Sequence, residues 1–164
     1  MGSSRCRAVG VMLVASAAVV LTASVAGAKA PTKVQRTVTD DFSSGSIRFV
    51  VTPSPSVVPA DRYKIQLVNN SIGPHVYVAV GGLPDDLTVD DFIELIDAVE
   101  GGAPPPEGTF EAGAVFAAPG KVHQKQFDFT VPGQYGFFCP IPTPSGTPHY
   151  KLGFVGLFDV VAPT

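Results

Sequence analysis

The residues of this sequence that could do metal chemistry lie mainly near its C-terminal end. Cys139 and His149 flank a segment in which positions 140, 142, 144 and 148 are proline. Because proline fixes φ and has no backbone donor, this loop cannot be a helix and is stiff before any ligand binds. A thiolate and an imidazole on such a loop favour a transition metal, copper first. His75, in SIGPHVYVAV, would supply a second imidazole.

The first 28 residues have the features of a secretory signal peptide. Arg5 and Arg7 form a positive n-region, residues 9–20 are apolar, and Ala26-Gly27-Ala28 is a small-residue cleavage site. We therefore expect export and cleavage after Ala28. If uncut, the uncharged run 8–28 is long enough to span a bilayer as an anchor.

The composition that remains after cleavage excludes several classes of protein. Nine Lys and Arg against 14 Asp and Glu give a net charge of −5, whereas nucleic-acid binding needs a basic surface. No second apolar segment is long enough to form a transmembrane helix. Cys139 becomes the sole cysteine, so no intramolecular disulfide can form, and a free thiol, an intermolecular bridge or a metal ligand remain.

Alternation of apolar and polar residues predicts a series of short strands from residue 47 onward. Prolines and glycines separate the strands, and about seven or eight of them indicate an antiparallel β-sandwich. We expect one domain over residues 47–164, preceded by a polar segment, 29–46, that is a linker or a loose first strand. The alternating apolar positions include Phe49, Val51, Tyr63, Ile65, Leu67, Tyr77, Ala79, Phe127, Phe129, Tyr135 and Phe137.

One segment departs from the β pattern. Apolar residues fall at helical spacing between positions 88 and 100, with Thr88 as a plausible N-cap, Asp90 and Asp91 in the first turn and Gly101 at the end. The sequence thus predicts one inserted helix. Residues 85–107 contain eight acids and no Lys or Arg, which indicates either a solvated helix face or a docking patch for a basic partner.

The C-terminal pattern resembles the ligand loop of the cupredoxins, the type 1 (blue) copper proteins of the plastocyanin and azurin superfamily. The resemblance lies in YGFFC, nine further residues, His149, four residues and FVGLFDV, together with NNSIGPHVYVAV around His75. It covers residues 47–161 and implies a Greek-key β-sandwich that binds one copper through His75, Cys139 and His149. Family members of this kind act in one-electron transfer.

The chain departs from the family at the axial position. The family pattern Cys-x(n)-His-x4-Met places Met where this sequence has Phe154, and no Met follows residue 28. The resemblance then implies a copper close to three-coordinate and a raised reduction potential. A backbone carbonyl such as that of Pro74 is the alternative axial contact. Many relatives have Asn where this chain has Val76, which puts a side-chain hydrogen bond near the sulfur in question.

Three other interpretations compete with a copper carrier. Cys139 as an enzymatic nucleophile would need an activating cation or helix N-terminus, and none is adjacent. A structural zinc site would need a fourth ligand. A cupredoxin-like module could instead store or deliver copper or bind a non-redox partner. A multicopper oxidase is disfavoured because there is one domain and no His-x-His pair, and His123, in KVHQKQ, is left out of the site.

The sequence therefore predicts an exported, monomeric type 1 copper protein that is not an enzyme and has no catalytic residue. We expect it to work outside the cytoplasm, with redox proteins as partners, no nucleic acid and no membrane span in the mature chain.

Overall fold

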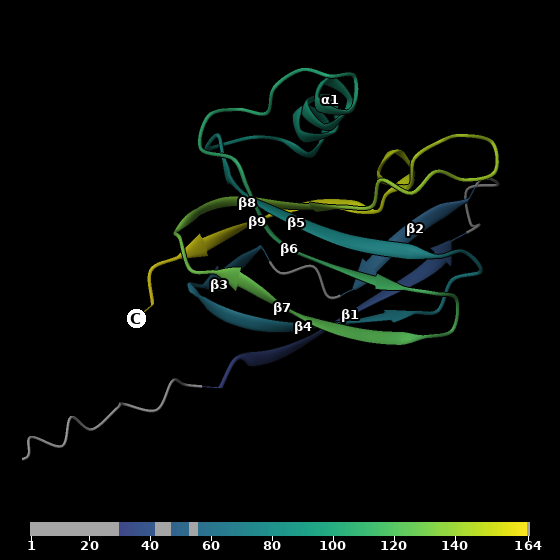
Figure 1. Ribbon diagram of the computed structural model, residues 1–164, viewed down its shortest axis with the longest axis horizontal. Helices are drawn as coiled ribbons and strands as arrows, with labels where there is room; N and C mark the ends of the chain where they lie inside the picture. Colours follow the sequence, from purple (N-terminus) through teal and green to yellow (C-terminus); the bar gives the residue numbers. More distant parts are fainter. Residues whose placement is uncertain (1–29, 42–46, 53–55, 164) are drawn as a thin grey trace, which may run out of the picture.

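Two facing β-sheets make up most of the chain (Figure 1). The computed structural model describes residues 30–41, 47–52 and 56–163. Within these ranges one sheet has the strand order β2-β1-β4-β7 and the other β3-β9-β8-β5-β6. The first sheet consists of β1 (Thr32–Asp41), β2 (Arg48–Thr52), β4 (Asp61–Asn69) and β7 (Val122–Phe129). The second consists of β3 (Val57–Pro59), β5 (His75–Leu83), β6 (Phe110–Ala117), β8 (Gly133–Phe138) and β9 (Val155–Val161).

The predicted β-sandwich with one inserted helix is confirmed, but its pairing is mixed rather than wholly antiparallel. β1 runs parallel to β4, and β3 runs parallel to β9. The polar segment 29–46 contains β1, which pairs with β2 and β4. The proposed signal peptide, residues 1–28, lies outside the described residues.

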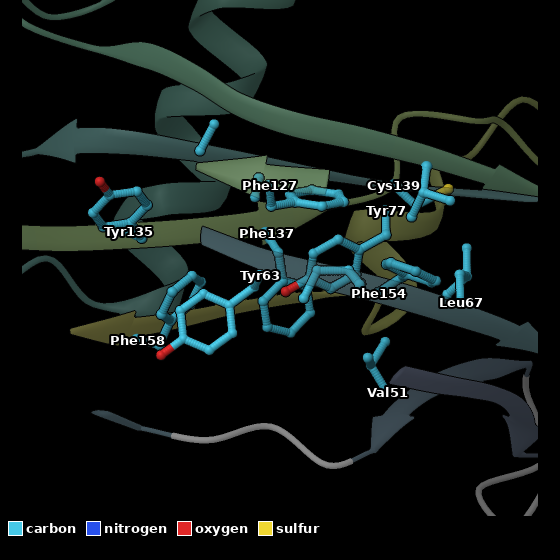
Figure 2. Packing of buried hydrophobic residues seen from close by; sticks show 14 of the residues in the cluster. Val51, Tyr63, Leu67, Tyr77, Phe127, Tyr135, Phe137, Cys139, Phe154 and Phe158 are labelled. Carbon is cyan, nitrogen blue, oxygen red and sulfur yellow. The ribbon is translucent and has the colours of Figure 1, made fainter. Parts of the chain in front are cut away.

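The space between the sheets is filled by apolar and aromatic side chains (Figure 2). Every second residue of β5 is buried, beginning with His75, as the alternation in the sequence predicted. β4 follows the same rule, and Ile65 and Leu67 are fully buried. In Figure 2, Cys139 lies toward one end of this core, and Tyr135 and Phe158 lie toward the other.

The predicted helix is present as α1 (Val89–Glu100), and its boundaries follow from its capping residues. The Thr88 side chain accepts a hydrogen bond from the backbone of Asp91, and the Asp91 carboxylate accepts one from the backbone of Thr88. This reciprocal pair forms a capping box, which satisfies two N–H groups that the first turn leaves free. The helix ends at Gly101, as predicted.

Helix α1 covers the outer face of the second sheet (Figure 1). Phe92 and Ile96 are buried there with Leu83 and Tyr150. A Cβ atom on Gly136 of β8 would lie 2.4 Å from the Phe92 ring, so the glycine makes room for the helix. Among the described residues, no helix is long and apolar enough to cross a bilayer.

Strand β7 is longer than the sequence suggested. The alternation predicts a strand only from Phe127, whereas β7 begins at Val122 and includes the polar run that contains His123. These first five residues are exposed, and they pair with β4 in the antiparallel register. Alternation signals a strand only where one face is buried, and here neither face is.

Candidate metal centre

The fold brings together the three residues that the sequence singled out. His75 begins β5, Cys139 directly follows β8, and His149 begins the short 3₁₀ helix η1 (His149–Leu152). β5 and β8 are antiparallel neighbours, so the start of one lies beside the end of the other. One ligand atom from each of His75, Cys139 and His149 lies within 4.8 Å of the other two. Nδ1 of His149 lies 3.5 Å from Cys139 Sγ and 3.1 Å from Nδ1 of His75.

The cluster is shielded from solvent. His75 and Cys139 are fully buried, and His149 is 4% exposed. The Phe49 ring packs against both imidazoles, with centroid distances of 4.6 Å to His75 and 4.4 Å to His149. The Phe154 ring stacks on His75 at 5.1 Å and 17°. The donor atoms are therefore surrounded largely by apolar side chains.

Backbone hydrogen bonds fix the loop that carries Cys139 and His149. Cys139 N–H donates to Phe154 O at 3.1 Å, and Phe154 N–H donates to His149 O at 3.0 Å. His149 N–H donates to Ile141 O at 3.0 Å. Gly153 ends η1 in the left-handed region, with φ of 99°, and a Cβ there would lie 2.8 Å from Phe49 O. The sequence predicted a stiff loop but not this helical turn after its last proline.

The sulfur of Cys139 accepts a hydrogen bond from the backbone. Val76 N–H lies 3.4 Å from Sγ. The sequence raised the concern that Val76 in place of Asn removes a side-chain donor, and the backbone N–H supplies one instead. Burial raises the pKa of the Cys139 thiol, and backbone hydrogen bonds from Val76 and Ile141 partly oppose that rise.

A buried polar network orients His75. Nε2 of His75 lies 2.7 Å from Ser71 Oγ, which donates to Asn69 Oδ1 at 2.7 Å. The Asn69 amide in turn donates to Gly73 O and Ala117 O. With Nε2 occupied in this way, Nδ1 of His75 faces Cys139 and His149. Metal-binding histidines are typically held by such a partner on the second nitrogen. The sequence pattern around His75 gave no sign that Asn69 and Ser71 support the imidazole.

The three donors are neutral when no ion is present. Burial, with a smaller contribution from His149, lowers the pKa of His75 to about 3. Burial also lowers the pKa of His149, and the Asp40 carboxylate opposes this. Both imidazoles are thus free to offer a lone pair at neutral pH, while the thiol still carries its proton. A bound cation would instead favour the deprotonated thiolate.

Two of the three donor separations are close to those expected for ligands of a single ion. Ligands at roughly 2.0 to 2.3 Å from a metal and 120° apart lie about 3.5 to 3.8 Å from one another. The distances of 3.5 Å and 3.1 Å to His149 Nδ1 are close to this range. Among the described residues, the cluster contains no fourth His, Cys, Asp or Glu. His123 lies elsewhere, exposed on β7.

Next to His149 the surface is hollowed. A depression of about 300 Å³ is lined largely by apolar and proline residues, and His149 forms part of its wall. The side chains of Phe49 and Ile72 take part in the lining, and Ile72 is 77% exposed. The acids of α1 lie elsewhere, on the helix that covers the second sheet.

Comparison with known proteins identifies the fold. No family model and no curated protein matches the sequence. The structure is similar to Na-dithionite-reduced auracyanin from the photosynthetic bacterium Roseiflexus castenholzii, with a TM-score of 0.53 and 23% identity over 80% of this chain and 98% of that one. The structure is also similar to auracyanin B, with a TM-score of 0.50 and 20% identity over 81% of this chain and 91% of that one. For the azurin Az-iso2 from Methylomonas sp. strain J, the TM-score is 0.50 and the identity 11%, over 80% of this chain and 99% of that one.

Proposed function

We propose that this chain, whose fold is that of the cupredoxins, is an exported type 1 copper protein that carries single electrons between partners outside the cytoplasm. One observation carries the proposal: His75, Cys139 and His149 bring a thiol and two imidazoles together in a buried cluster. That donor set is typical of copper electron-transfer sites. A copper ion held there would supply the Cu(I)/Cu(II) couple.

Rigidity of the donors supports electron transfer. A site that changes little between the two oxidation states has a low reorganisation cost. Here Cys139 and His149 lie on one hydrogen-bonded loop with four prolines, and His75 is held by Ser71. The chain's own contribution is therefore to hold three donors in place and to keep water out.

Phe154 is the residue we propose for the axial position. It is fully buried, carries no donor atom and stacks on His75. Removing a thioether donor and adding apolar cover destabilises the more highly charged Cu(II) state. We therefore infer a high reduction potential for this site.

The hollow beside His149 is where we propose that redox partners make contact. There His149, one of the proposed ligands, lines a surface depression. His149 would then be the route by which the electron enters and leaves. The signal-like residues 1–28, which fall outside the described ranges, are the basis for proposing export, and we propose that the remainder works as one monomeric copper-binding domain.

Burial disfavours the alternatives. A nucleophilic Cys needs access and a lowered pKa, whereas Cys139 is fully buried and its pKa is raised. Zinc in a structural site would need a fourth ligand, which the cluster lacks among the described residues. Copper delivery favours an exposed site from which the ion exchanges, and the three donors are enclosed.

Voltammetry of the copper-loaded full chain tests electron transfer against delivery. The proposal predicts a reversible one-electron wave and retention of copper through gel filtration in both oxidation states. Loss of copper from the reduced protein during gel filtration would favour storage or delivery instead and would count against an electron carrier.

A further inference from the structure

We propose that α1 positions the turn that carries His149, and that it does so through the hydrogen bond from the Tyr150 hydroxyl to Asp97. This inference rests on the proposed copper function, because it concerns how one of the proposed ligands is held. The inserted helix, which lies on the face of the second sheet opposite to the core, would then have a role at the metal site.

Asp97 links the helix to the ligand turn through polar contacts, in addition to the apolar cluster that Tyr150 shares with Phe92 and Ile96. The Tyr150 hydroxyl donates to Oδ1 of Asp97 at 2.7 Å, and Lys151 Nζ lies 2.8 Å from Oδ2. Tyr150 and Lys151 are the two residues that follow His149 in η1. Asp97 lies in the third turn of α1, so its position is set by the packing of Phe92 and Ile96 on the sheet.

Tyr150, which follows His149 in the chain, also contacts the Cys139 end of the ligand loop. Its backbone N–H donates to Cys139 O at 3.0 Å. Its ring meets the Phe138 ring edge-on, with centroids 6.2 Å apart, and Phe138 directly precedes Cys139. Movement of Tyr150 would therefore shift His149, its chain neighbour, and release a backbone bond to Cys139.

The hydrogen bond, rather than the ion pair, is the contact that we expect to matter. Tyr150 is 3% exposed and its hydrogen bond to Asp97 is partly buried, so loss of that partner would leave the hydroxyl only partly able to bind water instead. The side chains of Lys151 and Asp97 are each 41% exposed, and exposed ion pairs contribute little. Asp97 is accordingly a positioning residue that acts through Tyr150.

The first test measures the reactivity of Cys139 in the metal-free full chain. Cys6→Ser leaves one thiol, and a thiol reagent then reports how often the loop opens. Asp97→Ala and Tyr150→Phe should each speed modification about tenfold, since each removes a hydrogen bond to a charged acceptor. Asp97→Asn, which can still accept from the hydroxyl, should restore a rate close to that of the parent.

Two matched variants separate this contact from charge. Lys151→Gln removes only the ion pair, and Glu94→Gln neutralises an exposed acid of α1 that has no bonded partner among the described residues. Both should react at the parental rate. The double variant Asp97→Ala/Tyr150→Phe should react no faster than either single variant, because the two side chains share one interaction.

The second test uses copper. Asp97→Ala and Tyr150→Phe should release Cu(II) to a chelator about tenfold faster. Substitution of residues that orient metal ligands typically weakens metal binding by about 10- to 100-fold, and we expect an effect at the low end of that range. The two variants should also shift the thiolate-to-copper absorption band, whereas Asp97→Asn should not. If both variants lower the unfolding midpoint but leave thiol reactivity and copper release within twofold of the parent, α1 is merely structural and the proposal is overturned.

The two proposals fail differently. If the parent chain shows no thiolate-bound copper, the copper function fails, but the thiol measurement in the metal-free protein still decides whether Asp97 holds the ligand turn. Parental reactivity in Asp97→Ala would then overturn the role of α1 as well.

Discussion

At the scale of single residues, the chemistry of the candidate site depends on how burial acts on its three donors. Burial raises the pKa of Cys139 and lowers those of His75 and His149. In the absence of metal the cluster is therefore neutral, with a protonated thiol and two unprotonated imidazoles. The thiol must lose its proton before it can act as a ligand.

Copper binding should accordingly release about one proton between pH 7 and 8. The pKa of Cys139 is raised, so its proton is present throughout this range, whereas the pKa of His75, about 3, means that this imidazole has none to lose. The apparent Cu(II) affinity should rise about tenfold per pH unit. Competition with a chelator at several pH values measures this slope, and an affinity that does not change with pH would contradict the thiolate assignment.

Phe154→Met should lower the reduction potential. The substitution offers a thioether to a site that otherwise lacks an axial donor, and this favours Cu(II). We expect a fall on the order of 59 mV, which is a tenfold change for a one-electron couple. Phe158→Met serves as the control, because Phe158 is also buried in the core but contacts Tyr135 and Phe129 rather than a proposed ligand. Equal reduction potentials in the two variants would contradict the proposal that Phe154 occupies the axial position.

The sequence predicted the three candidate ligands because their residue types are rare in this chain and carry a known chemistry. It could not predict what surrounds them. The donor to the Cys139 sulfur is the backbone of Val76, which has no signature in the residue type. The support of His75 comes from Ser71 and Asn69, four and six residues earlier, and depends on how the intervening turn folds back.

At the scale of elements, α1 joins the outer face of the second sheet to the ligand turn. Its docking requires that Gly136 have no side chain, because the Phe92 ring occupies that space. Phe92 is 1% exposed and also meets the Phe138 ring edge-on, with centroids 6.0 Å apart. The helix is thus packed against the strand that leads into Cys139.

Gly136→Ala should destabilise the metal-free protein by about 1 to 3 kcal/mol, the usual cost of overpacking a well-filled site. Its Cβ would lie 2.4 Å from the Phe92 ring, so the ring or the helix must move. Gly73→Ala is the matched control, because a Cβ there meets nothing within 4 Å. Urea unfolding measures both, and equal stabilities would show that α1 does not pack as described.

The predicted elements were correct where the local pattern was strong. Thr88 and Gly101 mark the ends of α1 because capping depends on neighbouring residues only. The parallel pairing of β1 with β4 was not predicted, because it joins segments whose sequences carry no signal of their partner. The turn η1 was missed because four residues after a proline-rich loop are too few to show a helical period.

At the scale of the whole molecule, the proposed centre lies toward one end of the sandwich, and the aromatic core continues away from it (Figure 2). The acidic helix covers the outer face of the second sheet, and the apolar hollow lies beside His149. Partner contact at the hollow would therefore involve apolar surface, with the acids placed on a neighbouring face.

The visible absorption spectrum of the purified chain during titration with Cu(II) tests the central claim most directly. We predict an intense blue band that saturates at one copper per chain and is bleached by a mild reductant. Cys139→Ala should abolish the band while the β-sandwich remains folded, and His123→Asn should leave it unchanged. A colourless protein, only the pale spectrum of ordinary tetragonal Cu(II), or a blue band that persists in Cys139→Ala would contradict the account.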